Sequence, residues 1–242
     1  MIGLAVITYN RPDYCLKVLE SLIANNCGGA NKVIVIDDNS TISYKHIISL
    51  LYQTNISFYT NSTNRGVAHS KNKAFKLLLE AGCDHIFLME DDILMVDPDT
   101  CGYYISSAER FKVQHLNFGL HGTMNTGKGF WKDGVFCYPD CVGAFSYYSR
   151  EVLEKVGLMD ENFKNAWEHV EHTYRIIEAG YHPEFWNFAD CPISDELLKE
   201  IPGSIDNSVI RPRSDWMENI QRGRIYWDDK HGSWLPPRPK RR

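Results

Sequence analysis

The chain has 242 residues, of which 43% are hydrophobic and 24% charged, and its formal net charge is -5. That length accommodates one large domain, or one domain with a tail, and the composition is that of an ordinary soluble protein. No apolar run approaches the ~20 residues of a membrane-spanning helix, and the N-terminal MIGLAVITYNRP has no basic region before its short apolar stretch. We therefore expect a cytoplasmic protein with neither a membrane anchor nor a signal peptide.

Strands and helices are predicted to alternate from the start of the chain. Ile2–Thr8 is a short apolar run rich in β-branched residues, which is typical of a buried strand. A polar turn with Asn10 and Pro12 follows, and the next segment has Leu16 and Leu19 on one helical face. These segments give the first strand and the first helix of the fold.

Three more strands are predicted at 32–36, 56–60 and 85–89, with helices at 47–51 and 67–81 between them. Parallel neighbouring strands cannot be joined by tight hairpins and need a crossover segment, usually a helix. The alternation therefore predicts an α/β fold with a mostly parallel central sheet and flanking helices.

Polar clusters follow three of these strands, at residues 8–10, 37–39 and 90–92. In open α/β sheets, ligands bind outside the carboxyl ends of the strands. Turns are polar in any fold, so each cluster alone is also consistent with ordinary loop chemistry. Their equivalent positions after successive strands favour a shared ligand site.

The third cluster is the acidic triplet Glu90, Asp91 and Asp92 in the sequence FLMEDDIL. Adjacent carboxylates repel one another, which raises a pKa or attracts a counter-charge, and a divalent metal that holds a diphosphate would supply that charge. A solvated acidic turn is the alternative interpretation. The chain has no GxGxxG after its first strand and no GxxxxGK[ST], so a diphosphate would be held by a metal and side chains instead of a glycine-rich loop.

Several motifs, taken in order, resemble the nucleotide-sugar-dependent glycosyltransferases of GT-A fold, in particular family 2. They are VITYNRP, VIVIDDNS, NRGVAHSKN, FLMEDD, GAFSYYSREVLEKVGLMDENF and WEHVEHTYRIIEAGY, and the resemblance covers about residues 1–190. It implies a GT-A (Rossmann-like) sheet with a small acceptor-side subregion. It also implies a UDP-sugar donor, Mn²⁺ or Mg²⁺ as cofactor, and transfer with inversion at the anomeric carbon.

The resemblance assigns donor-site roles to residues at the strand ends. Asp92, as part of a DxD-like motif, is expected to bind the metal, and Asp91 is expected to approach the ribose or the sugar. The other residues expected around the nucleotide and the donor sugar are Thr8, Tyr9, Asn10, Arg11, Asp37 or Asp38, Arg65, Gly66, Asn72 and Glu90.

The chain departs from the family pattern at two places. Where family 2 members commonly have an Asp that deprotonates the acceptor, this chain has His169, so either His169 or the preceding Glu168 is the expected base. Where the family often supplies a His to the metal, this chain has Asp190; His182 and His231 are alternatives for that ligand.

The charge distribution along the chain bears on the domain organisation and on the chemical class of the acceptor. Residues 1–210 carry 17 Lys and Arg against 27 Asp and Glu, a charge of -10, whereas residues 211–242 carry nine against four, a charge of +5. We expect a glycosyltransferase domain at 1–210, with a nucleotide-sugar half at 1–95 and an acceptor half at 96–210, and a basic extension at 211–242. An acidic body repels a phosphate backbone, which favours a saccharide acceptor.

Other functions stay open at this point. The basic, aromatic extension, which ends in WLPPRPKRR, also suits a DNA acceptor with hydroxymethylated bases, or serves solubility alone. The altered Glu168-His169 pair leaves open a nucleotidyltransferase or an inactive nucleotide-sugar-binding protein.

Overall fold

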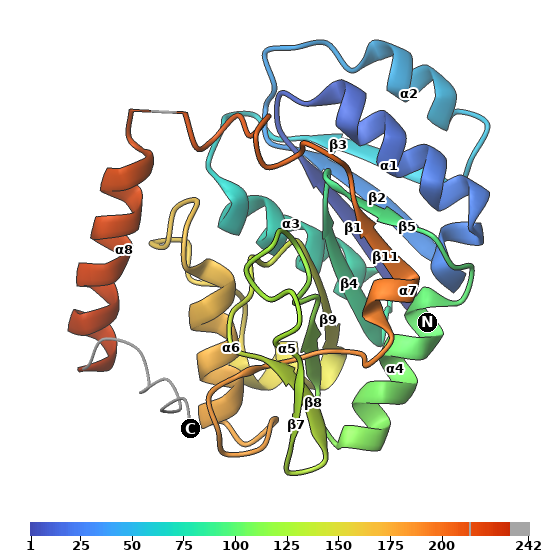
Figure 1. The fold of residues 1–242 in the computed structure, drawn as a ribbon. Helices are drawn as coiled ribbons and strands as arrows, with labels where there is room; N and C mark the ends of the chain where they lie inside the picture. Colours follow the sequence, from blue (N-terminus) through green and yellow to red (C-terminus); the bar gives the residue numbers. More distant parts are fainter. Residues whose placement is uncertain (213, 233–242) are drawn as a thin grey trace.

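A central six-stranded sheet organises the computed structural model, which describes residues 1–212 and 214–232. The first four strands in the chain are mutually parallel where they pair, and β9 runs antiparallel to both of its neighbours (Figure 1). The strand order is β3 (Ile56–Thr60), β2 (Lys32–Asp37), β1 (Ile2–Thr8), β4 (His85–Glu90), β9 (Phe145–Ser149) and β6 (His115–Asn117). The expected α/β class and mostly parallel sheet are confirmed.

The register of the sheet brings the polar strand ends together. Thr8 at the end of β1 lies opposite Asp37 at the end of β2. On the other side of β1, Ile7 pairs with Glu90, the last residue of β4. The three polar clusters that follow these strands therefore share one edge of the sheet, as the pattern of strand ends predicts.

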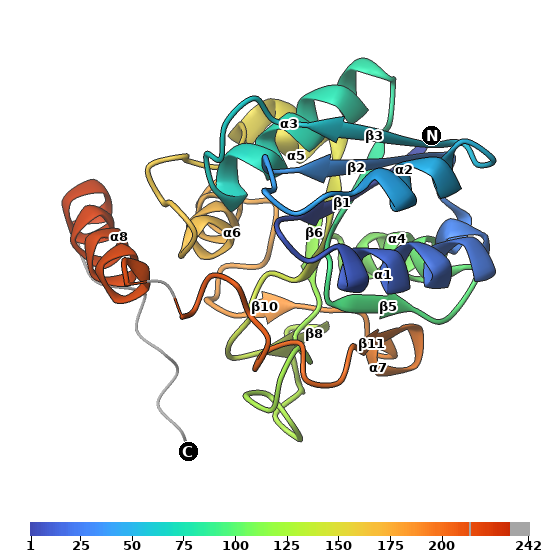
Figure 2. The ribbon, with the colours of Figure 1, turned by 90° about the horizontal axis from the view of Figure 1, so that it is seen from above.

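Helices cover both faces of the sheet, which gives three layers (Figure 2). Alternate strand residues point to opposite faces, so Leu4 packs with the helices of one layer and Ala5 with those of the other. The first layer contains α1 (Pro12–Ala24), α2 (Lys45–Leu51) and α4 (Thr100–Phe111). The second contains α3 (Val67–Glu80), α5 (Arg150–Val156) and α6 (Glu168–Glu178).

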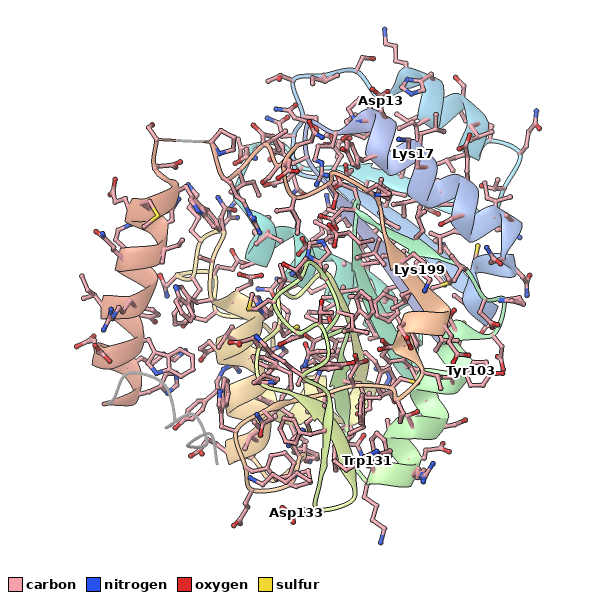
Figure 3. All side chains as sticks on the ribbon, viewed as in Figure 1. Asp13, Lys17, Tyr103, Trp131, Asp133 and Lys199 are labelled. Carbon is pink, nitrogen blue, oxygen red and sulfur yellow. The ribbon has the colours of Figure 1, made fainter. Side chains whose placement is uncertain are left out.

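Two small sheets and several short elements complete the fold. One small sheet has the order β10-β8-β7, and the other pairs β11 with β5. Figure 3 shows Trp131 and Asp133 at the tip of the β7–β8 hairpin, where the Trp131 side chain is 53% exposed. The remaining elements are η1 (Asn26–Gly29), β5 (Ile93–Met95), β7 (Phe130–Lys132), β8 (Val135–Tyr138), β10 (Phe188–Ala189), α7 (Ser194–Leu197), β11 (Leu198–Glu200) and α8 (Trp216–His231).

The predicted basic extension contains α8, which lies beside α6 (Figure 1). Trp227 on α8 is buried against Phe163 and Val170, and Lys230 of α8 lies 2.8 Å from the buried carboxylate of Glu171 on α6. The sequence WLPPRPKRR lies outside the described residues. In the described part of the chain, no helix is both long and apolar enough to cross a membrane.

Candidate active site

A cleft of about 430 Å³ opens at the carboxyl edge of the parallel strands. One side consists of the ends of β1 and β4, and the other of the start of α6 and the segment that leads into α8. Nine of the residues expected at the site line it, namely Thr8, Tyr9, Arg11, Asp38, Glu90, Asp91, Asp92, Glu168 and His169. Those that do not line it are Asn10, Asp37, Arg65, Gly66, Asn72 and Asp190.

Asp91 is buried at the floor of the cleft and held by two donors. The Thr8 hydroxyl donates to Oδ2 at 2.7 Å, and Nη1 of Arg11 donates to Oδ1 at 3.0 Å. Burial raises the pKa of Asp91 to about 7 in spite of the nearby Arg11 guanidinium, and the adjacent Asp92 adds to the rise. The raised pKa expected within the triplet therefore belongs to Asp91, with burial as its main cause and repulsion by Asp92 as a smaller one.

Asp92 faces a histidine from the other half of the chain. Nε2 of His121 lies 3.4 Å from its Oδ2, and Nη1 of Arg11 lies 3.5 Å from the same oxygen. Burial opposes the charge of Asp92, but His121 and Arg11 outweigh it and lower its pKa. Burial likewise opposes the charge of His121, and Asp92 raises its pKa above the ordinary value. The two side chains stabilise each other's charged forms.

The donor atoms around Asp92 fit a divalent cation. Within the described residues, Oδ1 of Asp92 and Nδ1 of His121 are buried without a hydrogen-bond partner, and Nε2 of His121 faces only the Asp92 carboxylate, at 3.4 Å. Buried polar atoms normally have partners, so such atoms in a cleft are consistent with a ligand. The described side chains form no cluster of three or more His, Cys, Asp or Glu that could hold a metal. Mg²⁺ is commonly bound by one or two carboxylates together with substrate phosphates, a mode that needs no larger cluster.

Asp190 is not placed to share a metal with Asp92, in contrast to the expectation. It is fully buried outside the cleft lining. Its two oxygens accept hydrogen bonds from Tyr104, Ser194 and the backbone amides of Gly119 and Cys191, at 2.7–3.0 Å. These four donors tie β10 to α4 and α7, so Asp190 has a structural role. The alternatives His182 and His231 do not line the cleft either.

The polar ends of β1 and β2 form the loops at the mouth of the cleft. Asp38 accepts hydrogen bonds from the backbone amides of Arg65 at 3.2 Å and Gly66 at 2.8 Å. Asp37 turns back to the hydroxyl and amide of Ser40. Asn10, which has a φ of 53°, accepts from the backbone amide of Thr41 at 2.7 Å. Of these three side chains, Asp38 lines the cleft, whereas Asp37 and Asn10 do not.

The NRGVAHSKN segment anchors α3 to the loop before α6. Asn72 donates to the carbonyl of Met159 at 2.8 Å and accepts from its amide at 2.9 Å. The Arg65 guanidinium lies 3.2 Å from Glu161. Gly66 has a φ of 93°, and a Cβ there would lie 2.8 Å from Oδ1 of Asn165, which explains a glycine at this position. Arg65, Gly66 and Asn72 do not line the cleft, but they hold in place the segments that form it.

The two candidate general bases, Glu168 and His169, lie at the N-terminus of α6, next to a buried lysine. Nζ of Lys71 lies 3.2 Å from Oε1 of Glu168 and 2.8 Å from Oε1 of Glu90. Burial opposes ionisation of Glu168, but Lys71 and His169 outweigh it and lower its pKa to about 2. Nδ1 of His169 lies 3.4 Å from Oε1 of Glu168, and its Nε2 lies 3.1 Å from the carbonyl of Cys141. Glu168 is therefore ionised at neutral pH.

The segment before α8, together with the first turns of α8, forms one wall of the cleft. Nη2 of Arg11 donates to the carbonyl of Ser204 at 3.2 Å, and Nε1 of Trp167 donates to the carbonyl of Ile220 at 3.2 Å. Trp167 has a φ of 72° immediately before α6 begins. The lining from this part of the chain consists of Ser204, Ile205, Ser208, Val209, Ile210, Arg211, Trp216 and Ile220.

Sequence reasoning missed Lys71, His121 and this C-terminal wall. For Lys71 a signal exists, because Ala68, Lys71, Phe75 and Leu78 recur at helical spacing and a lysine interrupts an otherwise apolar stripe. His121 lies in a loop after β6, and no local pattern points from that loop to Asp92. The wall likewise depends on the return of the chain through β11, which pairs with β5 in a separate two-stranded sheet.

The N-terminal part of the chain is similar to a known protein family. Residues 4–112 match the family model of glycosyl transferase family 2. No curated protein sequence matches the chain. The matched residues include the acidic triplet but end before His121, so much of the cleft lies outside the match. The resemblance expected from the sequence is confirmed for this segment.

Solved structures show the same fold. TarS of S. aureus is 17% identical over 73% of this chain and 33% of the TarS chain, with a TM-score of 0.56. The mannosyltransferase PcManGT from Pyrobaculum calidifontis, solved with GDP-Man and Mn²⁺, is 17% identical over 75% of this chain and 53% of its own, with a TM-score of 0.58. GalNAc-T7, solved with UDP, GalNAc and Mn²⁺, is 11% identical over 99% of this chain and 52% of its own, with a TM-score of 0.60. The chain thus spans about a third to a half of the length of these structures.

Proposed function

We propose that this chain, which has the GT-A fold and is similar to glycosyl transferase family 2, is a glycosyltransferase that moves a sugar from a nucleotide-sugar donor to an acceptor hydroxyl. One observation carries this proposal. At the carboxyl end of β4, Asp92 and His121 present buried, unpartnered oxygen and nitrogen atoms to a cleft whose opposite side holds the ionised Glu168. Transfer of a sugar from a diphosphate needs both of these functions in one cavity.

The donor side of the cleft suits a nucleoside diphosphate-sugar. Thr8, Tyr9 and Asp38 line the part of the cleft where we propose that the base and ribose bind, and Arg11 and Asp91 line it as well. Asp92 and His121, the latter after loss of one ring proton, are the residues that would hold Mn²⁺ or Mg²⁺. When bound, the ion would offset the negative charge that builds on the diphosphate as the sugar leaves. Solved relatives bound to UDP, UDP-GlcNAc or GDP-Man support a nucleotide-sugar, and we propose UDP-sugar as the donor.

The acceptor side supplies the base. Glu168, ionised at neutral pH, accepts the proton of the acceptor hydroxyl, and His169 beside it is the alternative base. The acceptor oxygen then forms a bond to the anomeric carbon as the bond from that carbon to the diphosphate breaks. A single displacement of this kind inverts the configuration at the anomeric carbon, and an NMR reading of the product anomer tests this step.

A saccharide acceptor is supported by the surroundings of Glu168. A second cavity of about 240 Å³ shares four lining residues with the cleft, and its own wall includes Trp186, Phe188 and Asp140. Aromatic faces with a carboxylate suit the apolar faces and hydroxyls of a sugar, whereas a carboxylate and the charge of -10 over residues 1–210 disfavour a phosphate backbone.

The test is a donor screen with a matched variant pair. Wild-type protein is incubated with UDP-sugars and Mn²⁺, with and without saccharide acceptors, and UDP release is measured. Asp92→Asn should abolish release, and Asp13→Asn, which removes the same charge from an exposed position on α1 (Figure 3), should leave it unchanged. Wild-type protein that binds UDP but turns over no donor would refute the proposal, and release of pyrophosphate from a nucleoside triphosphate would favour a nucleotidyltransferase.

A further inference from the structure

Lys71 is a fully buried lysine in the middle of α3, with an exposed fraction of 1%. Its ammonium group is 2.8 Å from Oε1 of Glu90 and 3.2 Å from Oε1 of Glu168, and it donates to the carbonyl of Gly143 at 3.1 Å. An ammonium group has three donors, so these three oxygens account for all of them. The partners come from the end of β4, the loop before β9 and the first residue of α6.

Such a placement is costly for folding alone. A buried charge loses several kcal/mol of hydration, and replacing buried ion pairs by apolar residues is often neutral or stabilising. Lys71 also interrupts the apolar stripe of Ala68, Phe75 and Leu78, where a Leu or Met would pack well. An ammonium at this position therefore points to a function of its two carboxylate partners, Glu90 and Glu168, both of which line the cleft.

The two carboxylates differ in exposure, which shows where the lysine acts most strongly. The Glu90 side chain is 28% exposed and keeps part of its hydration, whereas the Glu168 side chain is 4% exposed. Without a counter-charge, burial raises the pKa of a carboxyl group by up to several units, so that the group stays protonated to higher pH. His169, on the same helix, faces Glu168 at 3.4 Å, and Tyr148 of β9 faces Lys71. Lys71 is the permanent cation of this group.

We propose that Lys71 is a positioning residue that keeps Glu168 ionised and directed at the acceptor hydroxyl. The inference rests on the proposed transferase function. In the step that it serves, the acceptor O–H proton passes to a Glu168 oxygen. The acceptor oxygen bonds to the anomeric carbon, and the electron pair of the broken carbon–oxygen bond leaves with the diphosphate. Without Lys71, Glu168 already carries a proton near neutral pH and cannot take another.

The test compares Lys71→Met with Lys71→Arg by the pH profile of kcat, with UDP binding as a second readout. Between pH 6.5 and 8.5, kcat should change by the same factor in wild-type protein and in Lys71→Arg, and by less than about fivefold, because Asp91, whose pKa is about 7, titrates in the cleft over this range. In Lys71→Met, kcat should be far lower at pH 6.5 and should rise at least about tenfold by pH 8.5, as Glu168 loses its proton. UDP binding, which does not use Glu168, should keep the wild-type pH dependence.

A structural role alone gives a different result. If Lys71→Met lowers kcat by the same factor at pH 6.5 and 8.5, the inference is overturned. Lys71→Met leaves two neighbouring carboxylates, so the double variant Lys71→Met/Glu90→Gln carries the same test if the single variant does not fold. Wild-type protein without turnover on any donor would instead contradict the proposed function, so the two failures are distinguishable.

Discussion

Glu171 joins α6 to α8, and its neutralisation tests how firmly the C-terminal helix is held. The carboxylate is fully buried. Nε of Arg175 donates to both of its oxygens at 2.9 and 3.0 Å, and Nζ of Lys230 donates to Oε1 at 2.8 Å. His231 lies 3.3 Å from the same oxygen. The variant Glu171→Gln keeps the size of the side chain and removes its charge.

The structure sets the size of the effect. Removing one partner of a buried ion pair costs about 3–5 kcal/mol when the other charge stays buried. Here the Arg175 and Lys230 side chains are 22% and 28% exposed, so water can compensate part of the loss. Gln also still accepts a hydrogen bond from Arg175. We therefore expect the free energy of unfolding to fall by about 2–3 kcal/mol.

Urea unfolding of the full chain measures this change, with the transition midpoint lowered and the slope unchanged. The control is Glu218→Gln on α8, because Glu218 and Arg222 are 66% and 60% exposed and 3.8 Å apart. That exposed pair should contribute less than about 1 kcal/mol. If Glu171→Gln changes stability no more than this control does, the argument from burial is wrong.

Three further predictions concern single residues. His121→Gln should weaken Mn²⁺ binding, measured by EPR titration, by about 10–100-fold, the range found when residues that support a metal are replaced; unchanged affinity would remove His121 from the metal site. His115 is fully buried, which lowers its pKa from 6.5 to about 3. The unfolded chain therefore binds a proton below pH 6.5 that the folded protein does not. Asp91 and Asp190, whose pKa values are raised to about 7, act in the opposite direction, so the contribution of His115 is the difference between wild-type protein and His115→Gln. As the pH falls from 6.5 to 4.5, the stability of wild-type protein relative to this variant should fall by up to about 1.4 kcal/mol per pH unit, as followed by urea unfolding at each pH. A difference that does not change with pH would contradict this. Gly66→Ala places a methyl group against Asn165 at a φ of 93°; we expect a loss of about 1–3 kcal/mol and a raised KM for the donor, and an Ala variant with wild-type stability would show that this turn is not strained.

The sequence predicts the sheet well because its signals are local. β1, β3 and β4 begin where the apolar runs begin, and β1 and β3 also end as expected, since β-branched residues and polar turns mark strand limits directly. The parallel alternation then places Asp38, Asp91 and Asp92 at one edge without further information. The carboxyl-end rule for α/β sheets is therefore sufficient for the donor side of the cleft.

The rest of the site depends on contacts between distant parts of the chain. Asp190 occupies a place in sequence that suggests a ligand, yet it turns to Tyr104, which is 86 residues away in sequence. His121 reaches Asp92 only because β6 joins the sheet beyond β9. Side-chain direction after a crossover is set by packing of the whole domain, and no window of local sequence contains that information.

The hydrogen bond from Arg11 to the carbonyl of Ser204, which spans 193 residues, also has a consequence for biosynthesis. A chain that grows at 5–20 residues per second needs roughly 5–20 s to extend from the end of the family 2 segment at residue 112 to Ile220, the last residue of the cleft wall. For most of that time the acidic edge of the nascent sheet lacks Ser204 and the rest of the cleft wall. The cleft is therefore among the last features of the described fold to be completed during synthesis, and under the proposed function a nascent chain without this wall would not yet turn over a donor.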